Sequence, residues 1–267
     1  MPFEVCDTEG KRLDEVVEYV KNWVAEKCRE SVMQYKYCEH DNFEDYASGR
    51  VLYSAEGVAN FPVRLINEIF GYAKEYSVKK QDLCVYDPCC GGGYSLTVLG
   101  FMNADVIKRL CGSDVDTKMV EVAGKNLALL REDGLEKRSA EIKALYELYG
   151  KASHADALES VVRLKKKMHG GIATEVFVAD CTEELPRLLP DIIITDVPYG
   201  NLVEWNTESN DPLYDMLQQL AGISHQDTVL AVSMDKKQKV IHPAWIRKKK
   251  QIIGKRKFEI YVRNKLQ

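Results

Sequence analysis

Four aspartates could form one acidic site, because each follows a short apolar stretch that is typical of a buried strand. They are Asp87, Asp114, Asp180 and Asp196. In an open parallel sheet the carboxyl ends of the strands share one edge, and ligands bind in the crevice outside that edge. The sequence therefore predicts a ligand site that is built from the ends of successive strands.

The first of these acids opens a glycine-rich turn, which reads Asp-Pro-Cys-Cys-Gly-Gly-Gly at positions 87–93. Glycine lets a backbone approach a ligand closely and adopts a positive φ without strain. A dinucleotide site calls for a small residue where Leu96 stands, and a phosphate loop calls for Gly-Lys-Ser/Thr, which this turn lacks. The turn therefore favours a cationic or neutral nucleotide-like ligand, and an ordinary strand-to-helix turn is the alternative.

The acids after the second and third strands are candidates for binding other parts of such a ligand. An acid after the second strand commonly accepts hydrogen bonds from ribose hydroxyls, and both Asp114 and Asp116 stand there. Asp180 is placed to accept a hydrogen bond from an adenine amino group. It could equally cap the helical turn that follows, and the two roles are compatible.

The fourth acid begins the segment Asp-Val-Pro-Tyr-Gly at positions 196–200. A ring amine is a poor nucleophile because its lone pair is delocalised. A carboxylate and a backbone carbonyl can accept its hydrogens and orient that lone pair, and the ring of Tyr199 can stack on an extruded base. A strand-to-loop turn with a packed tyrosine is the alternative. The segment has no cysteine for covalent attack on cytosine, and the nearby Cys181 is more simply a small buried residue.

These motifs resemble those of known enzyme families. The turn at 87–93 resembles motif I of the class I methyltransferases, Asp-Pro-x-Cys-Gly-x-Gly, which binds S-adenosylmethionine. The segment at 196–200 is similar to the Asn/Asp-Pro-Pro-Tyr/Phe motif of amino-group methyltransferases, from which Val197 departs. From about Val51 onward the chain resembles the AviRa family of avilamycin-resistance rRNA methyltransferases, in which Asp-x-Pro-Tyr is the usual form. Three further segments carry this resemblance: Phe61–Leu65, Ser113–Asp116 and Lys125–Leu130.

The resemblance implies S-adenosylmethionine-dependent methylation of a base, a guanine, in large-subunit ribosomal RNA, and a link to antibiotic resistance. The residues expected to hold the cofactor are Arg64, Asp87, Pro88, Cys89, Cys90, Gly91, Gly93, Asp114, Asp116, Asp180 and Cys181. Those expected to face the target base are Asp196, Pro198 and Tyr199. Two alternatives stay open: a methyltransferase for DNA adenine or a protein amide, and a non-catalytic assembly factor that binds the cofactor or RNA.

The order of the elements predicts an α/β fold with a seven-stranded Rossmann-like sheet, mostly parallel and closed by an antiparallel strand. Residues 1–60 are predicted to be an N-terminal helical extension, with one long helix over about 12–38, and residues 61–267 the methyltransferase domain. The charged stretch at about 131–170 is predicted to be a helical insertion broken near Gly150. The strands are expected at Leu83–Asp87, Leu110–Asp114, Thr174–Ala179, Asp191–Thr195, Thr228–Met234 and, as a pair, within Gln251–Val262. The other helices are expected at Phe61–Tyr76, Tyr94–Lys108, Thr117–Leu130, Glu183–Leu188 and Pro212–Leu220.

Composition indicates a cytoplasmic protein without a membrane partner, because no apolar run reaches membrane-spanning length and residues 1–10 lack the core of a signal peptide. Eight cysteines without Cys-x-x-Cys spacing predict reduced thiols and no metal site. The net charge is −4, yet twelve Lys and Arg residues lie between Lys236 and Lys265 with Glu259 as the one acid among them. This cluster predicts a face that binds RNA phosphates, and a solvated surface is the alternative.

Overall fold

The structure is a computed structural model that describes residues 12, 14–21, 35–54, 60–168, 170–197 and 209–265. The chain divides into two compact units, Met1–Gln34 and Tyr35–Gln267. In the first unit, residues 14–21 are helical. The second unit contains the sheet and all of the elements described below. The domain boundary at residue 60 stays a prediction.

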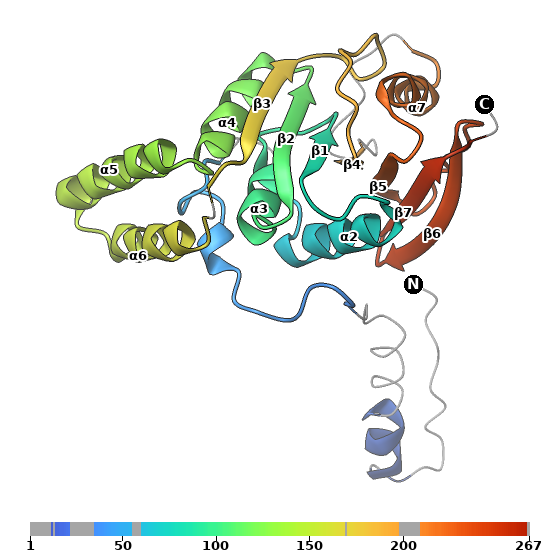
Figure 1. The fold of residues 1–267 in the computed structure, drawn as a ribbon. Helices are drawn as coiled ribbons and strands as arrows, with labels where there is room; N and C mark the ends of the chain where they lie inside the picture. Colours follow the sequence, from blue (N-terminus) through green and yellow to red (C-terminus); the bar gives the residue numbers. More distant parts are fainter. Residues whose placement is uncertain are drawn as a thin grey trace. The chain divides into compact units, whose positions relative to one another are not determined.

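The second unit is built on one seven-stranded sheet in the order β3-β2-β1-β4-β5-β7-β6 (Figure 1). Strands β1 to β5 pair in parallel, and β7 pairs antiparallel with both β5 and β6. This confirms the predicted sheet and its antiparallel closing strand, although the final strand pair begins at Trp245 rather than at Gln251. The strands are β1 (Leu83–Asp87), β2 (Ile107–Asp114), β3 (Ala173–Val178), β4 (Ile192–Asp196), β5 (Val229–Asp235), β6 (Trp245–Ile253) and β7 (Arg256–Arg263).

Helices cover both faces of this sheet, which is why β4 begins with three isoleucines and is buried up to Thr195. Successive side chains of a strand point to opposite faces. On β7, Phe258 contacts Tyr72 of the helix α2, whereas Tyr261 belongs to the core cluster formed with α7. The two helices therefore lie on opposite faces. The helices that flank the sheet are α2 (Val63–Tyr76), α3 (Tyr94–Met102), α4 (Thr117–Ala128) and α7 (Pro212–Ile223).

The helical insertion is a hairpin that projects from the sheet, as Figure 1 shows. It consists of α5 (Glu132–Tyr149) and α6 (Ala152–Lys166), which pack against each other. Gly150 ends α5 with a φ of +61°, a conformation that costs glycine little. The predicted break near Gly150 is therefore confirmed.

The predicted helix over 12–38 is wrong at its end, because residues 35–38 are not helical. The carboxylate of Glu68 on α2 is fully buried and accepts hydrogen bonds from the backbone N–H groups of Lys36, Tyr37 and Cys38, at 2.6, 2.7 and 2.9 Å. These N–H groups satisfy the buried charge instead of a helix. Residues 22–34 of the predicted helix lie outside the described residues.

Two other predicted helices were also wrong: the one at Glu183–Leu188 does not form, and the one from Tyr94 is shorter than predicted. Residues 184–190 form no regular helix, because Pro186 removes a backbone donor and disfavours the helical conformation of the residue before it. Helix α3 ends at Met102 rather than at 108, since Asn103 leaves the helical conformation and donates a hydrogen bond to the carbonyl of Leu99. Strand β2 consequently starts at Ile107, three residues earlier than predicted.

Candidate active site at the carboxyl edge of the sheet

Asp114, at the end of β2, fixes the glycine-rich turn that follows β1. Its Oδ2 accepts a hydrogen bond from the N–H of Gly91 at 2.8 Å, and its Oδ1 accepts one from Asp116 at 3.0 Å. The hydroxyl of Ser113 adds a bond to the carbonyl of Pro88 at 3.3 Å. The turn is therefore held by the neighbouring strand before any ligand arrives.

Two glycines of the turn have different structural requirements. Gly93 has a φ of +71°, and a Cβ there would lie 2.9 Å from Ala123 of α4, so only glycine fits between the turn and this helix. Gly91 has a φ of +50°, and a Cβ there would meet nothing within 4 Å. The backbone at Gly91 thus faces open space, which a ligand can occupy.

Among the acids of the site, Asp87 has the pKa that departs most from its ordinary value. Burial is the main cause that raises its pKa to about 7, with a contribution from the nearby charges of Asp114 and Asp196 and against a hydrogen bond from the N–H of Cys89. Burial disfavours the charged form of a carboxyl group. A cationic ligand beside Asp87 would favour the ionised form and relieve this penalty.

Asn126 on α4 supports the turn from behind, and sequence reasoning did not single out its role. It is fully buried, and its Nδ2 donates to the carbonyls of Gly92 and Tyr53 at 2.8 and 3.1 Å. Its Oδ1 accepts from the N–H of Tyr53 at 2.7 Å. Its position among the apolar residues of the buried face of α4 could have indicated this role, because a buried amide needs hydrogen-bond partners.

Asp116 and Asp180 both perform local structural roles in this structure. Asp116 caps α4 by accepting a hydrogen bond from the N–H of Lys118 at 2.8 Å. Oδ1 of Asp180 accepts from the N–H and the hydroxyl of Thr182, at 2.8 and 2.7 Å. Asp180 therefore makes the predicted capping hydrogen bond, and the segment that it caps is a short turn rather than a helix. Their contacts to a cofactor stay predictions.

Two cysteines, one after β1 and one after β3, are in contact at the carboxyl edge. The Sγ atoms of Cys89 and Cys181 lie 3.5 Å apart; Cys181 belongs to the core cluster on the α7 face of the sheet, and Cys89 packs against it. Cys90 is buried against Gly112, where a Cβ would lie 2.9 Å from the Cys90 Sγ. The six described cysteines are free thiols, and the described residues contain no cluster of three or more potential metal ligands.

Asp196 ends β4 between β1 and β5, at the same edge as Asp87. The next residue, Val197, donates its N–H to the carbonyl of Ser233 at 3.0 Å. A proline has no N–H and could not make this bond, which gives a structural reason for the departure from the Pro-Pro form. Pro198 and Tyr199 lie outside the described residues.

Arg64 and the basic cluster have contacts of their own. The guanidinium of Arg64 donates to the carbonyl of Cys38 at 3.0 Å and lies 3.8 Å from the ring centre of Tyr35, so its described contacts run to the segment before α2. Its role toward the cofactor stays a prediction.

In the basic cluster, Lys249 lies 4.1 Å from the ring centre of Tyr72, whereas Lys248 and Lys250 of the edge strand β6 are exposed.

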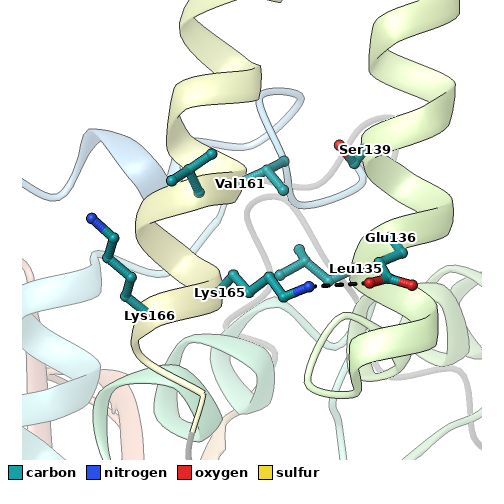
Figure 2. Close-up of a pocket in the computed structure, with 7 residues that line it drawn as sticks. Leu135, Glu136, Ser139, Val161, Lys165 and Lys166 are labelled. Carbon is teal, nitrogen blue, oxygen red and sulfur yellow. Dashed lines mark hydrogen bonds and ion pairs between the residues drawn. The ribbon is translucent and has the colours of Figure 1, made fainter.

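The pocket in Figure 2 belongs to the insertion and not to this edge of the sheet. It measures about 400 Å³ and lies between α5 and α6. Leu135 and Val161 are among the residues that line it, and the Nζ of Lys165 is 3.1 Å from Oε1 of Glu136 across it. The described residues contain no helix long and apolar enough to cross a membrane.

The carboxyl edge fits S-adenosylmethionine in its donor chemistry. The open backbone at Gly91 is a cradle that any side chain would fill, and the buried carboxyl of Asp87 is matched to a ligand that carries positive charge. The described part of the turn presents no Lys or Arg, in agreement with a cofactor that has no phosphate.

Comparison with known proteins identifies the family. The model of the rRNA methyltransferase AviRa family matches residues 33–256. A 23S rRNA (guanine(2535)-N(1))-methyltransferase from Streptomyces viridochromogenes is 36% identical over 214 residues, which cover 76% of this chain and 84% of that protein. A solved structure of the rRNA methyltransferase aviRa from the same organism superposes with a TM-score of 0.78 at 33% identity, covering 86% of this chain and 96% of that one.

A more distant structure shares the fold alone. TrmN from Thermus thermophilus superposes with a TM-score of 0.50 at 14% identity, over 76% of this chain and 49% of its own. Together, the match to the family model and the 36% identity over most of both chains establish membership. The chain belongs to the AviRa family of rRNA methyltransferases.

Proposed function

We propose that this protein transfers a methyl group from S-adenosylmethionine to N1 of a guanine in large-subunit ribosomal RNA, in the cytoplasm. The convergence of Asp87, Asp114 and Asp196 beside the open turn at Gly91 carries the proposal. The similarity to a 23S rRNA guanine-N1 methyltransferase supports the choice of base and atom.

The cofactor supplies an electrophilic methyl group on a sulfonium centre, and the protein positions the reactants. Gly91, Gly93 and Asp114 shape the turn that would hold it, with Asp87 as the buried counter-charge. In solution N1 of guanine carries a hydrogen, so methylation at N1 requires its removal. Asp196 is the carboxylate that would accept this proton as a general base. Pro198 and Tyr199 would hold the extruded base beside it.

Transfer of labelled methyl groups tests the proposal directly. Purified protein and tritiated S-adenosylmethionine are incubated separately with large-subunit ribosomal RNA, with DNA and with ribosomal protein. We expect label in the RNA alone. Asp196→Ala should retain binding of S-adenosylhomocysteine, measured by calorimetry, yet lose most of the transfer, because Asp196 acts on the target base rather than on the donor.

Other outcomes would favour the alternatives. Label in DNA or protein would support an adenine or amide methyltransferase. Cofactor binding without transfer to any of the three would support a non-catalytic assembly factor. Near-normal transfer by Asp196→Ala would mean that another group accepts the proton of the base.

A further inference from the structure

Arg256 reaches across the sheet to the proposed general base. It is the first residue of β7, which lies two strands away from β4 (Figure 1). Its Nη1 is 3.7 Å from Oδ2 of Asp196. About a third of each side chain is exposed, 32% for Arg256 and 31% for Asp196, so a substrate can reach both.

The backbone and a nearby ring fix where this guanidinium lies. Arg256 is the partner of Asp235 at the end of β5, and Ser233, two residues earlier, is the partner of Asp196. The guanidinium carbon is also 5.6 Å from the ring centre of Phe61, a buried residue just before α2. This distance falls within the range of a cation–π contact.

The 3.7 Å separation suits a pair of groups that bind adjacent atoms of a third molecule. It is longer than a hydrogen bond of 2.7–3.2 Å. A carboxylate only accepts hydrogen bonds and a guanidinium only donates them. The Watson–Crick edge of guanine presents the complement, because its N1–H donor stands next to its O6 acceptor.

We propose that Arg256 donates to O6 of the target guanine and stabilises the negative charge that O6 gains when Asp196 removes the N1 proton. This inference rests on the proposed function. As the proton passes from N1 to the Asp196 carboxylate, the N1 electron pair forms the new bond to the methyl carbon. The bond between that carbon and sulfur breaks, and its electron pair stays on sulfur. The proton on Asp196 then returns to solvent.

The same pair would reject bases with an amino group at this edge. Adenine and cytosine present a ring nitrogen acceptor to Asp196 and an amino donor to Arg256, so both contacts would be repulsive. Once a bound base covers the two side chains, a site of this kind discriminates strongly against a base that leaves its polar groups without partners. Arg256 would therefore determine base specificity as well as rate.

The test is a single-turnover measurement with the full-length protein, unmodified large-subunit rRNA transcript and tritiated S-adenosylmethionine, with RNA and cofactor saturating. We expect Arg256→Ala to lower the rate constant for methyl transfer at pH 7 by about 10²–10³-fold, the usual effect of losing a group that stabilises a developing oxyanion. The deficit should shrink above pH 8, because hydroxide then supplies deprotonated guanine. Arg256→Lys should recover part of the rate, since the ammonium keeps the charge without the planar fork.

Arg109→Ala is the matched control. Arg109 is also a strand arginine paired with a carboxylate, Glu175, and its side chain is 39% exposed, but it lies near the start of β2, far from the carboxyl edge. It should keep the wild-type rate constant. Circular dichroism and the melting shift caused by S-adenosylhomocysteine should match wild type in both variants, which separates a chemical effect from misfolding.

Two results would overturn the inference: a rate constant for Arg256→Ala equal to that of Arg109→Ala, or a deficit that is the same at every pH. Failure of the proposed function looks different, because wild type would then transfer no methyl group to the transcript. Methylation of a uracil N3, which also adjoins a carbonyl, would contradict the choice of guanine while leaving the role of Arg256 intact.

Discussion

Asp87 gives the site a measurable dependence on pH. Burial raises its pKa to about 7, whereas an aspartate in an unfolded chain titrates near 4. Between about pH 4 and pH 7 the folded protein therefore binds more protons than the unfolded chain. The contribution of Asp87 to the free energy of unfolding of the cofactor-free protein should therefore decrease as the pH rises from 4 to 7.

Asp87→Asn should accordingly raise the free energy of unfolding, because asparagine stays neutral and can still accept the N–H of Cys89. The gain should grow from pH 5 to pH 8, where it should be on the order of 2–4 kcal/mol for a pKa difference of roughly three. Thermal melts of the two proteins across this range measure it. The exposed residue Asp105, changed to Asn, is the control, and melting curves of Asp87→Asn that follow wild type at every pH would contradict the account.

The same titration should control binding of the methyl donor. Ionised Asp87 attracts a sulfonium cation, so the affinity of wild type for S-adenosylmethionine should rise as the pH increases through about 7. Asp87→Asn should bind it more weakly and lose this pH dependence. Isothermal titration between pH 6 and pH 8 tests both expectations, and an affinity of wild type that falls over this range would exclude Asp87 as the counter-charge.

At the scale of elements, the strands were predictable and their supports were not. The strand that ends in Asp87 is easy to recognise, because an apolar run is followed by proline and glycine, which commonly mark the end of a strand. By contrast, the contact of Glu68 with residues 36–38 joins positions about thirty residues apart, and no local pattern contains it. The same holds for Asn126, whose partners Tyr53 and Gly92 lie far away along the chain.

The candidate site shows the same division. The four strand-end acids followed from the rule that parallel strands share a carboxyl edge. Arg256 appeared in the sequence only as one cation of a basic cluster, because its pairing with Asp196 depends on the register between β5 and β7. A sequence pattern gives the order of strands along the chain, whereas the registers that bring the side chain of Arg256 near Asp196 across β5 are a property of the assembled sheet.

The edge strand β6 carries a prediction about RNA binding. Lys248 and Lys250 are exposed on it, whereas Lys249 packs on the ring of Tyr72. If the two exposed lysines contact phosphates, binding releases counterions, with a salt slope of about −0.7 per contact for single strands. Changing both to Gln should flatten the slope by roughly that amount for each lost contact, and equally for unrelated RNA sequences.

Filter binding of a large-subunit rRNA fragment across a salt series measures this slope. Lys137→Gln with Lys143→Gln removes the same charge from exposed positions on α5 and should leave the slope unchanged. If the α5 double variant has a flattened slope and the β6 double variant has the wild-type slope, the RNA-binding surface lies on the helical insertion instead.

At the scale of the whole molecule, the sheet brings distant parts of the sequence to the proposed reacting centre. Asp87 comes from β1, Asp196 from β4 and Arg256 from β7, and all three meet at the carboxyl edge. Such a centre should act on one atom of one kind of base, because each group is assigned to a defined atom of the cofactor or of guanine.

The most direct test identifies the methylated atom. Large-subunit ribosomal RNA treated with the protein and S-adenosylmethionine is digested to nucleosides and analysed by mass spectrometry against standards, with primer extension to locate the site. We predict N1-methylguanosine at one position, where reverse transcription stops because N1 can no longer pair, and none with Asp196→Ala. Methylation of a different atom, such as N7 or N2 of guanine, or of an adenine would contradict the account.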